Sequence, residues 1–302
     1  MEDLSYSYIL GVPVTIMNVV WVAITTLLMA SYFSNHILKP GGATGSIFKY
    51  FIEYGKSQSI RAGFDFPKRY FTHYYVLATL WNGACCFTIV ALCYGRLDNN
   101  WVANSFMLHE SDQPKGDQLS VIMVIIMITL HSAKRLYECL FVSVFSSNAR
   151  INAIHYIWGF TYYLLLAPTL ISECLPLNKL PFGSIQLRHV IGIAGFIVAS
   201  FIHHQSHLIL ANLRKTGRVK QESHGLPQGG LFGFVSCPHY FAEVLIYVFT
   251  LVIVRSQCVS WWVVLVYNIV VHVNMAKTAH VWYQQNFPNY PPSKKAFIPF
   301  LF

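Results

Sequence analysis

The chain contains the segment His189–Leu210, HVIGIAGFIVASFIHHQSHLIL, which has no Asp, Glu, Lys or Arg. An α-helix needs about 20 predominantly apolar residues to cross the hydrocarbon core of a bilayer. Six other stretches are long enough, or nearly long enough, to do the same. The sequence therefore predicts an all-α integral membrane protein with seven transmembrane helices in a single domain over residues 1–302. The other six predicted spans are Val12–Phe33, Tyr74–Tyr94, Leu119–Phe141, Ile154–Ile171, Tyr240–Val254 and Ser260–Met275.

The composition also indicates a membrane protein. Hydrophobic residues make up 55% of the 302 residues and charged residues only 11%, whereas soluble domains contain about 25% charged residues. The net charge of +9 would attract the protein to anionic membrane lipids. Because the sequence contains no basic soluble domain, we expect no nucleic-acid partner, and no obligate protein partner is evident.

Lysine and arginine are distributed unevenly between the connections. Counted on alternate sides of seven spans, one side has 16 of these residues and the other has 5. Because cytosolic loops carry the excess of positive charge, the N-terminus is predicted to be outside or lumenal and the C-terminus cytosolic. The tail from Trp282 to Phe302 is too polar and too often interrupted by proline to span, so we expect it to form a cytosolic cap.

Residues 211–302 contain basic and glycine-rich motifs that a simple anchor does not need. The segment Arg214–Lys220, which includes Lys215, is followed by Gly229 and Gly230. Cations pair with phosphate oxygens, and glycines let backbone N–H groups approach them. This region is therefore predicted to carry the main motifs for a phosphate-bearing cofactor. The alternative is a loop that is basic only because it faces the cytosol.

An acidic residue, Glu243, lies inside a predicted span. It follows His239 by four residues, so both side chains lie on one face of the helix. A carboxylate within a membrane is energetically costly and is usually functional or paired. We therefore predict a functional role for Glu243; the alternative is an interfacial residue whose span begins later.

The third span closes with Lys134-Arg135-Leu136-Tyr137-Glu138. A neutral tyrosine hydroxyl can donate a proton at pH 7, so Tyr137 is predicted to be the catalytic proton donor, with Glu138 orienting it. The alternative is an internal ion pair between Arg135 and Glu138, which are three residues apart.

The fifth span contains His203-His204-x-x-His207, a spacing similar to one histidine box of membrane di-iron oxidases. Such a site needs several boxes to surround two metal ions, and the other histidines are scattered. We therefore expect no metal, and we expect His203 and His207 to line a polar pocket.

Three runs of the C-terminal third resemble the steroid 5-alpha-reductase family. They are Leu-Pro-Gln-Gly-Gly-Leu-Phe (226–232), the Val235-Ser236 run that leads to Glu243, and the tail from Tyr290 to Phe300. Two earlier runs, Asp65–Tyr75 and Arg135–Ser146, resemble the polyprenol (polyprenal) reductase branch. The resemblance implies a seven-helix reductase of the endoplasmic reticulum that uses NADPH to reduce a carbon–carbon double bond conjugated to a carbonyl.

The resemblance also implies which residues contact NADPH and where the chain departs from its steroid-reducing members. His207 and His239 stand where those members have Asp and Asn, and their carbonyl-polarising tyrosine falls near Ser132. Their Gln-Glu substrate pair has no clear counterpart, so the acid remains open. The implied cofactor contacts are His207, Arg214, His224, Gly229, His239, Glu243 and Tyr283.

The chemistry restricts the substrate to an activated alkene. When a hydride adds to an enal, the negative charge moves to oxygen, where a donor can stabilise it; an allylic alcohol offers no such sink. We therefore expect polyprenal, reduced at its alpha-isoprene unit to dolichal, over polyprenol, in support of dolichol-linked N-glycosylation. The alternatives are a 3-oxo-5-alpha-steroid 4-dehydrogenase or enoyl-CoA reductase of the same superfamily, and a seven-helix receptor or channel without catalysis.

Overall fold

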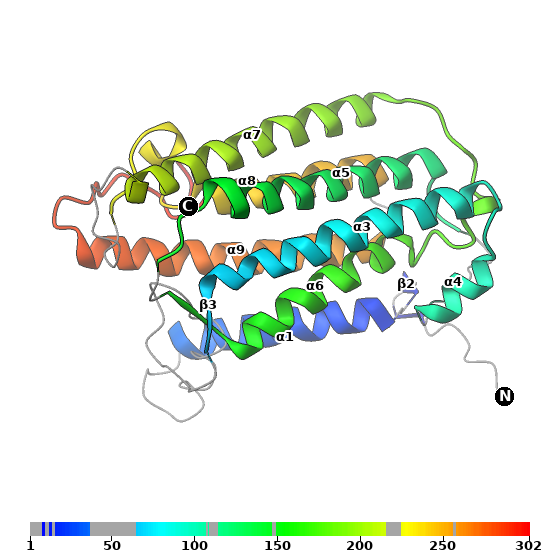
Figure 1. Cartoon of the computed structure of the whole chain (residues 1–302), viewed down its shortest axis with the longest axis horizontal. Coiled ribbons are helices and arrows are strands. Elements are labelled where there is room, and N and C mark those ends of the chain that lie inside the picture. Colours follow the sequence, from blue (N-terminus) through cyan, green and yellow to red (C-terminus); the bar gives the residue numbers. More distant parts are fainter. Residues whose placement is uncertain are drawn as a thin grey trace.

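The protein is built mostly from long α-helices that lie side by side (Figure 1). The computed structural model describes residues 8–9, 12–13, 16–36, 65–106, 108, 114–146, 149–215, 225–255 and 258–302, with side chains omitted at the edges of some of these ranges. Each of the seven predicted segments contains a helix, although the first segment begins with a short strand at Val12–Pro13. The corresponding helices are α1 (Ile16–His36), α3 (Phe71–Cys93), α5 (Gln118–Tyr137), α6 (Ala153–Ile171), α7 (Leu187–Lys215), α8 (Pro238–Val254) and α9 (Val259–Asn286).

Five of these helices are long and apolar enough to cross a membrane. They are α3 together with the 3₁₀ turn η2 (Lys68–Tyr70), α5 together with the π-helical turn η3 (Glu138–Val142), α6, α7 and α9. Helix α8 and the Ile16–Ala30 part of α1 are apolar but shorter. The predicted multi-pass, mostly helical membrane protein is thus confirmed.

The remaining elements are short. Strands β1 (Tyr8–Ile9) and β2 (Val12–Pro13) form one antiparallel pair, and β3 (Asp65–Pro67) and β4 (Arg150–Asn152) form another. These strands add a small amount of β-structure to the all-α architecture that the sequence predicts. Between the long helices lie α4 (Asn99–Ser105) and the 3₁₀ turns η4 (Leu177–Lys179) and η5 (Gly230–Gly233).

Helix α1 is held in the bundle by a buried tryptophan. The indole of Trp21 is fully buried and donates a hydrogen bond to Thr169 Oγ1 of α6 over 2.9 Å. Its ring packs against Tyr162 of α6 and Tyr267 of α9, with centroids 5.5 and 5.0 Å apart. Because a buried indole N–H needs a partner, this arrangement fixes both the depth and the rotation of α1.

Helices α7 and α8 approach each other closely through glycines. A Cβ at Gly195 would lie 2.2 Å from the ring of Phe249, and one at Gly192 would lie 2.4 Å from the side chain of Ile253. Small residues at helix contacts allow such close approach, which drives packing inside membranes. The close contact aligns the two helices that carry His203 and Glu243.

An ion pair joins the beginnings of α5 and α7. Arg188 Nη2 lies 2.8 Å from Asp117 Oδ2, and Asp117 also caps α5 by accepting from the backbone N–H of Ser120 at 2.9 Å. Burial alone would raise the pKa of Asp117, but the hydrogen bonds from Ser120 and Arg188 lower it below its ordinary value. The carboxylate therefore stays charged and holds the beginnings of α5 and α7 together.

Candidate active site

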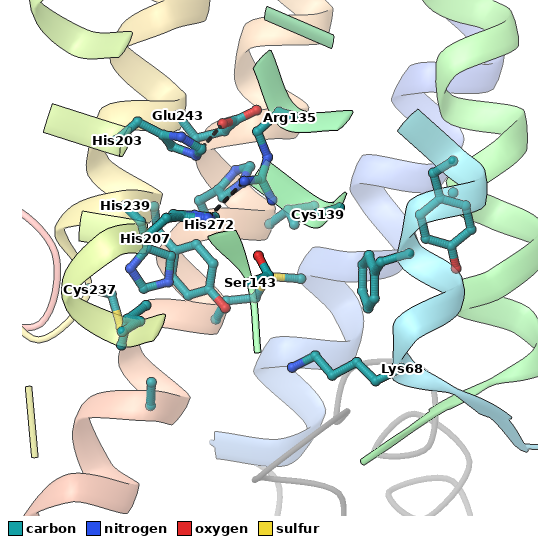
Figure 2. A pocket seen from close by; sticks show the side chains of 18 of the residues that line it. Lys68, Arg135, Cys139, Ser143, His203, His207, Cys237, His239, Glu243 and His272 are labelled. Atoms are coloured by element: carbon teal, nitrogen blue, oxygen red, sulfur yellow. Dashed lines mark hydrogen bonds and ion pairs between the residues drawn. The ribbon is translucent and has the colours of Figure 1, made fainter. Parts of the chain in front are cut away.

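A cavity of about 480 Å³ lies at the end of the bundle where α5, α7 and α9 finish and α3, α6 and α8 begin (Figure 2). Residues from all six of these helices line it, from Lys68 to Tyr283. One wall is polar and charged. The other wall is rich in aromatic side chains, including Phe71, Tyr74, Trp158, Tyr162, Tyr163 and Tyr267.

Glu243 of α8 forms the centre of the polar wall. One carboxylate oxygen lies 3.0 Å from His131 Nε2 of α5, and the other lies 2.9 Å from His203 Nε2 of α7. The side chain is 15% exposed and borders the cavity. The acid that the sequence places inside a span is therefore paired, as the cost of a buried carboxylate requires, and it remains accessible to a ligand.

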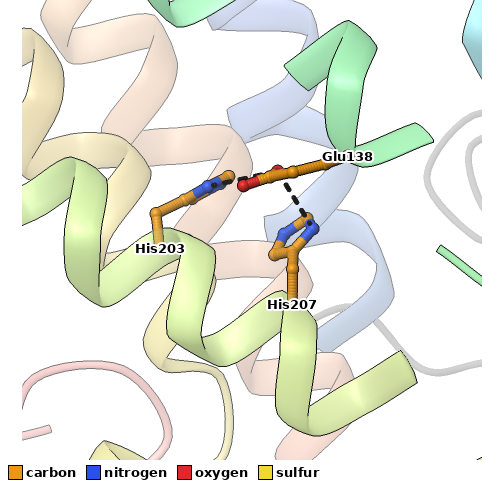
Figure 3. Close-up of side chains that lie close together, drawn as sticks. All are labelled: Glu138, His203 and His207. Atoms are coloured by element: carbon orange, nitrogen blue, oxygen red, sulfur yellow. Dashed lines mark ion pairs between the residues drawn. The ribbon is translucent and has the colours of Figure 1, made fainter. Parts of the chain in front are cut away.

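A second acid, Glu138, lies directly behind this wall. Its side chain is fully buried and forms an ion pair with Arg135, and it accepts a hydrogen bond from His204 Nδ1 over 2.8 Å. His207 Nδ1 lies 3.5 Å away and His203 Nδ1 3.8 Å (Figure 3). The π-helical turn η3 begins at Glu138; such turns are frequent at functional sites.

Glu138, His203 and His207 bring three ligand atoms within 4.8 Å of one another, as a metal site would. Two cations already use the histidine nitrogens: Arg135 Nη1 lies 2.8 Å from His207 Nδ1, and Lys134 Nζ lies 2.9 Å from His203 Nδ1. These contacts occupy the lone pairs that would bind a metal ion. The cluster is better explained as a charge-balanced network of Lys134, Arg135, Glu138 and Glu243.

Five of the residues predicted to bind the cofactor line this one cavity. Gly229 lies in the turn that precedes η5, where its φ of 89° favours glycine, and it does not line the cavity. His224 and the side chain of Lys215 lie outside the residues that the structure describes. The five that line the cavity are His207, Arg214, His239, Glu243 and Tyr283.

The structure separates Tyr137 from the cavity. Its side chain is 54% exposed on the outer surface of α5, where its ring packs against Phe141 with centroids 5.2 Å apart. Successive residues of a helix point about 100° apart, so the neighbouring Glu138 faces the interior. Tyr137 is therefore not positioned to donate a proton to a ligand in this cavity.

Sequence reasoning missed Tyr75, which does line the cavity. Its hydroxyl oxygen accepts hydrogen bonds from Arg135 Nε at 3.3 Å and Nη2 at 3.2 Å. The guanidinium carbon lies 4.8 Å from the centre of the Tyr75 ring. Tyr75 lies in the predicted Asp65–Tyr75 motif, but nothing in the sequence pairs it with Arg135, sixty residues later.

Ser236 forms hydrogen bonds that hold the C-terminal tail, the segment after Asn286, beside the cavity. The Ser236 hydroxyl contacts Tyr290 OH, lies 2.6 Å from His280 Nδ1 and donates to the carbonyl of Lys295 over 3.2 Å. The Tyr290 ring stacks on Tyr283, a residue of the cavity wall, at 5.9 Å. Burial raises the pKa of Tyr290 despite its hydrogen bond with Ser236, so its hydroxyl stays protonated.

Replacing Ser236 with Ala is expected to loosen this tail. The substitution removes the hydroxyl that contacts Tyr290, His280 and the Lys295 carbonyl, at a cost of about 1–3 kcal/mol. Tyr290 and His280 keep only their 3.3 Å contact with each other at this point, and the carbonyl keeps the backbone N–H of Ser236. Limited proteolysis of membranes should then cleave the segment after Asn286 about tenfold faster or more. The control is Ser105→Ala, because Ser105 is exposed and bonds only to Trp101 of its own helix. Cleavage at the wild-type rate in Ser236→Ala would show that the tail is held by other contacts.

Comparison with known proteins identifies the family. Residues 159–302 match the family model for 3-oxo-5-alpha-steroid 4-dehydrogenase. A polyprenal reductase of Danio rerio is 34% identical over 304 residues, covering 95% of this chain and 98% of the relative. A polyprenal reductase of Homo sapiens is 35% identical, over 95% of this chain and 96% of the relative. A polyprenal reductase of Xenopus tropicalis is 37% identical, over 85% of this chain and 89% of the relative. The chain belongs to the steroid 5-alpha-reductase family, in the branch of the polyprenal reductases.

Proposed function

We propose that the protein is an NADPH-dependent reductase of the endoplasmic reticulum membrane that reduces the alpha-isoprene double bond of polyprenal to give dolichal. Dolichol-linked protein N-glycosylation is the process that this product would serve. The observation that carries the proposal is one cavity with an ionic wall that includes Glu243 and an opposite aromatic wall. Its relatives bear the name of the same activity.

The ionic wall suits NADPH. Arg214 borders the cavity and can pair with phosphate oxygens. Glu243 can accept hydrogen bonds from an amide or a ribose hydroxyl, and it lies one helical turn after His239 on α8. When bound, NADPH supplies the hydride. Glu243, held by two histidines, then orients the ligand and keeps its own charge within the membrane.

Tyr75 is the proposed partner of the substrate carbonyl, in place of Tyr137. As the alkene accepts a hydride, negative charge develops on the aldehyde oxygen and needs a donor. The Tyr75 hydroxyl can donate its proton there because its oxygen already accepts two hydrogen bonds from Arg135. The enol that this protonation gives would then tautomerise to the saturated aldehyde. The guanidinium stabilises the phenolate that forms, and Glu138 holds the guanidinium in place.

The aromatic wall suits an isoprenoid. Trp158, Tyr162 and Tyr267 offer large apolar faces, and their polar atoms bond within the protein: Trp158 Nε1 donates to Tyr267 OH over 2.6 Å. Such a surface can bind a hydrocarbon chain while its polar head lies at the ionic wall. A very long chain can continue into the bilayer, so the cavity need enclose only the first isoprene units.

The proposed topology has seven spans, a lumenal N-terminus and a cytosolic C-terminal cap. The excess of Lys and Arg lies in the connections at the end of the bundle that contains the cavity. The positive-inside rule places this end in the cytosol, where NADPH is available. Residues 211–302 would then supply much of the cofactor site, and α3, α5 and α6 would supply the rest.

Turnover of three substrates side by side tests this function. Purified protein in liposomes should oxidise NADPH with polyprenal and release dolichal, identified by mass spectrometry. Polyprenol should react far more slowly, because its allylic alcohol has no sink for the charge. If a 3-oxo-4-ene steroid is reduced and polyprenal is not, the steroid dehydrogenase alternative replaces this proposal.

A further inference from the structure

Lys68 lines the cavity, and hydrogen bonds of the backbone around it fix its position. Its peptide N–H donates to the carbonyl of Ala149 over 2.8 Å, directly after β3 pairs with β4. The residue opens the 3₁₀ turn η2 that leads into α3. The small sheet therefore fixes the point from which the side chain starts, and Figure 2 shows the chain extending from there toward the region of Ser143.

Arg214 borders the same part of the cavity from α7. Its Nη1 donates to the carbonyl of Val144 over 2.7 Å, which places the guanidinium beside the exit of η3. Lys68 and Arg214 therefore both face this cavity, one from η2 and the other from α7. Two like charges that face one cavity destabilise each other, and an anion between them would remove that cost.

Cations outnumber acids among the described residues that line the cavity, which also favours an anionic ligand. Among the described residues that line the cavity, three are cations (Lys68, Arg135 and Arg214) and one is an acid, Glu243. Behind the wall, Glu138 pairs with Arg135 and lies 3.8 Å from Lys134. The two acids thus lie beside Lys134 and Arg135, and Lys68 and Arg214 are two further cations of the described lining.

We propose that Lys68 binds a phosphate group of the cofactor together with Arg214. The inference rests on the proposed function, since NADPH is the anionic ligand that function requires. It adds a residue from the segment before α3 to a site that the sequence motifs assign mainly to residues 211–302. The phosphate oxygens belong either to the 2′-phosphate or to the pyrophosphate of the cofactor. NADH has only the pyrophosphate, so a comparison of NADPH with NADH distinguishes the two.

The test measures direct binding of NADPH and NADH to the purified full-length protein by fluorescence titration. In Lys68→Met, the dissociation constant for NADPH should rise about tenfold, the loss expected for one charge-assisted hydrogen bond. Lys68→Arg should retain most of the affinity because it keeps the cation. The matched control is Arg69→Met: Arg69 is the next residue, is exposed and does not line the cavity, so the same change of net charge should leave binding unchanged.

The two cofactors show which phosphate is bound. A loss confined to NADPH assigns Lys68 to the 2′-phosphate, and 2′,5′-ADP should then lose affinity in parallel. An equal loss for NADPH and NADH assigns it to the pyrophosphate. Wild-type NADPH affinity in Lys68→Met, or an equal loss in Arg69→Met, overturns the proposal. Failure of the wild-type protein to reduce polyprenal while it binds NADPH would instead overturn the proposed function and leave the binding result interpretable.

Discussion

Replacing Glu243 with Gln is expected to weaken NADPH binding at least tenfold while the protein still inserts into membranes. The carboxylate lies between His131 and His203 and borders the cavity. An amide of the same shape can accept through its oxygen only, because its NH₂ group donates. Losing a hydrogen bond to a charged group costs about 1.5–3 kcal/mol, and every 1.4 kcal/mol is about tenfold in affinity. Titration of the purified variant with NADPH measures the loss.

A second buried carboxylate provides the control. Glu173 lies at the opposite end of the bundle, where it accepts hydrogen bonds from the backbone N–H groups of Val259 and Ser260 at the start of α9. Glu173→Gln removes a buried negative charge of the same kind, 4% exposed, without touching the cavity. It should leave NADPH affinity unchanged even where it lowers stability. Wild-type affinity in Glu243→Gln would mean that this carboxylate only joins α5, α7 and α8.

The helices could be predicted from the sequence because long apolar runs leave a membrane segment few alternatives. Backbone polar groups within a bilayer must be paired internally, and a helix does this over any apolar stretch. The end of α9 was harder to predict. The apolar run stops near Met275, yet the helix continues to Asn286, because Ala279 and Tyr283 pack against the cavity end of the bundle.

The cofactor motifs could be predicted in part, because they are local. Gly229 and the pair His239–Glu243 are recognisable from spacing alone, and the structure brings His239 and Glu243 to one cavity. Tyr75 and Lys68 could not be found in this way. Each owes its proposed role to a residue far along the chain: Tyr75 bonds to Arg135, and Lys68 faces the same cavity as Arg214. Only the packing of α3 against α5, and the grouping of η2 and α7 around one cavity, brings these residues together.

The proton donor could not be predicted from the sequence either, because neighbouring residues of one helix face different directions. Tyr137 and Glu138 are neighbours in the sequence, and an ionisable cluster beside a tyrosine is a reasonable pattern for an acid. The rotation of the helix decides which side chain faces the cavity, however, and charged residues flank Tyr137 on both sides, so the sequence does not show which face of the helix is turned inward. The structure turns Glu138 inward and leaves Tyr137 beside Phe141.

Replacing Tyr75 with Phe is therefore expected to lower kcat for polyprenal by about 10²–10⁴-fold, the usual contribution of positioned acid catalysis. The ring remains and keeps its contact with the Arg135 guanidinium at 4.8 Å, so NADPH affinity should stay near the wild-type value. Only the hydroxyl that would donate to the aldehyde oxygen is lost. Single-turnover measurements with NADPH and polyprenal separate this loss of chemistry from any loss of binding.

Tyr137→Phe is the matched control, because it removes the same hydroxyl from a ring that lies on the outer surface of α5. Its kcat should be normal. The opposite pattern, with Tyr137→Phe slow and Tyr75→Phe normal, would mean that Tyr137 is the proton donor. The end of α5 would then have to rotate about its axis by about 100° when the substrate binds, the angle between successive residues of a helix. If both variants react normally, the aldehyde oxygen must receive its proton from another cavity group, and Tyr283 and the histidines beside Glu243 become the residues to replace next.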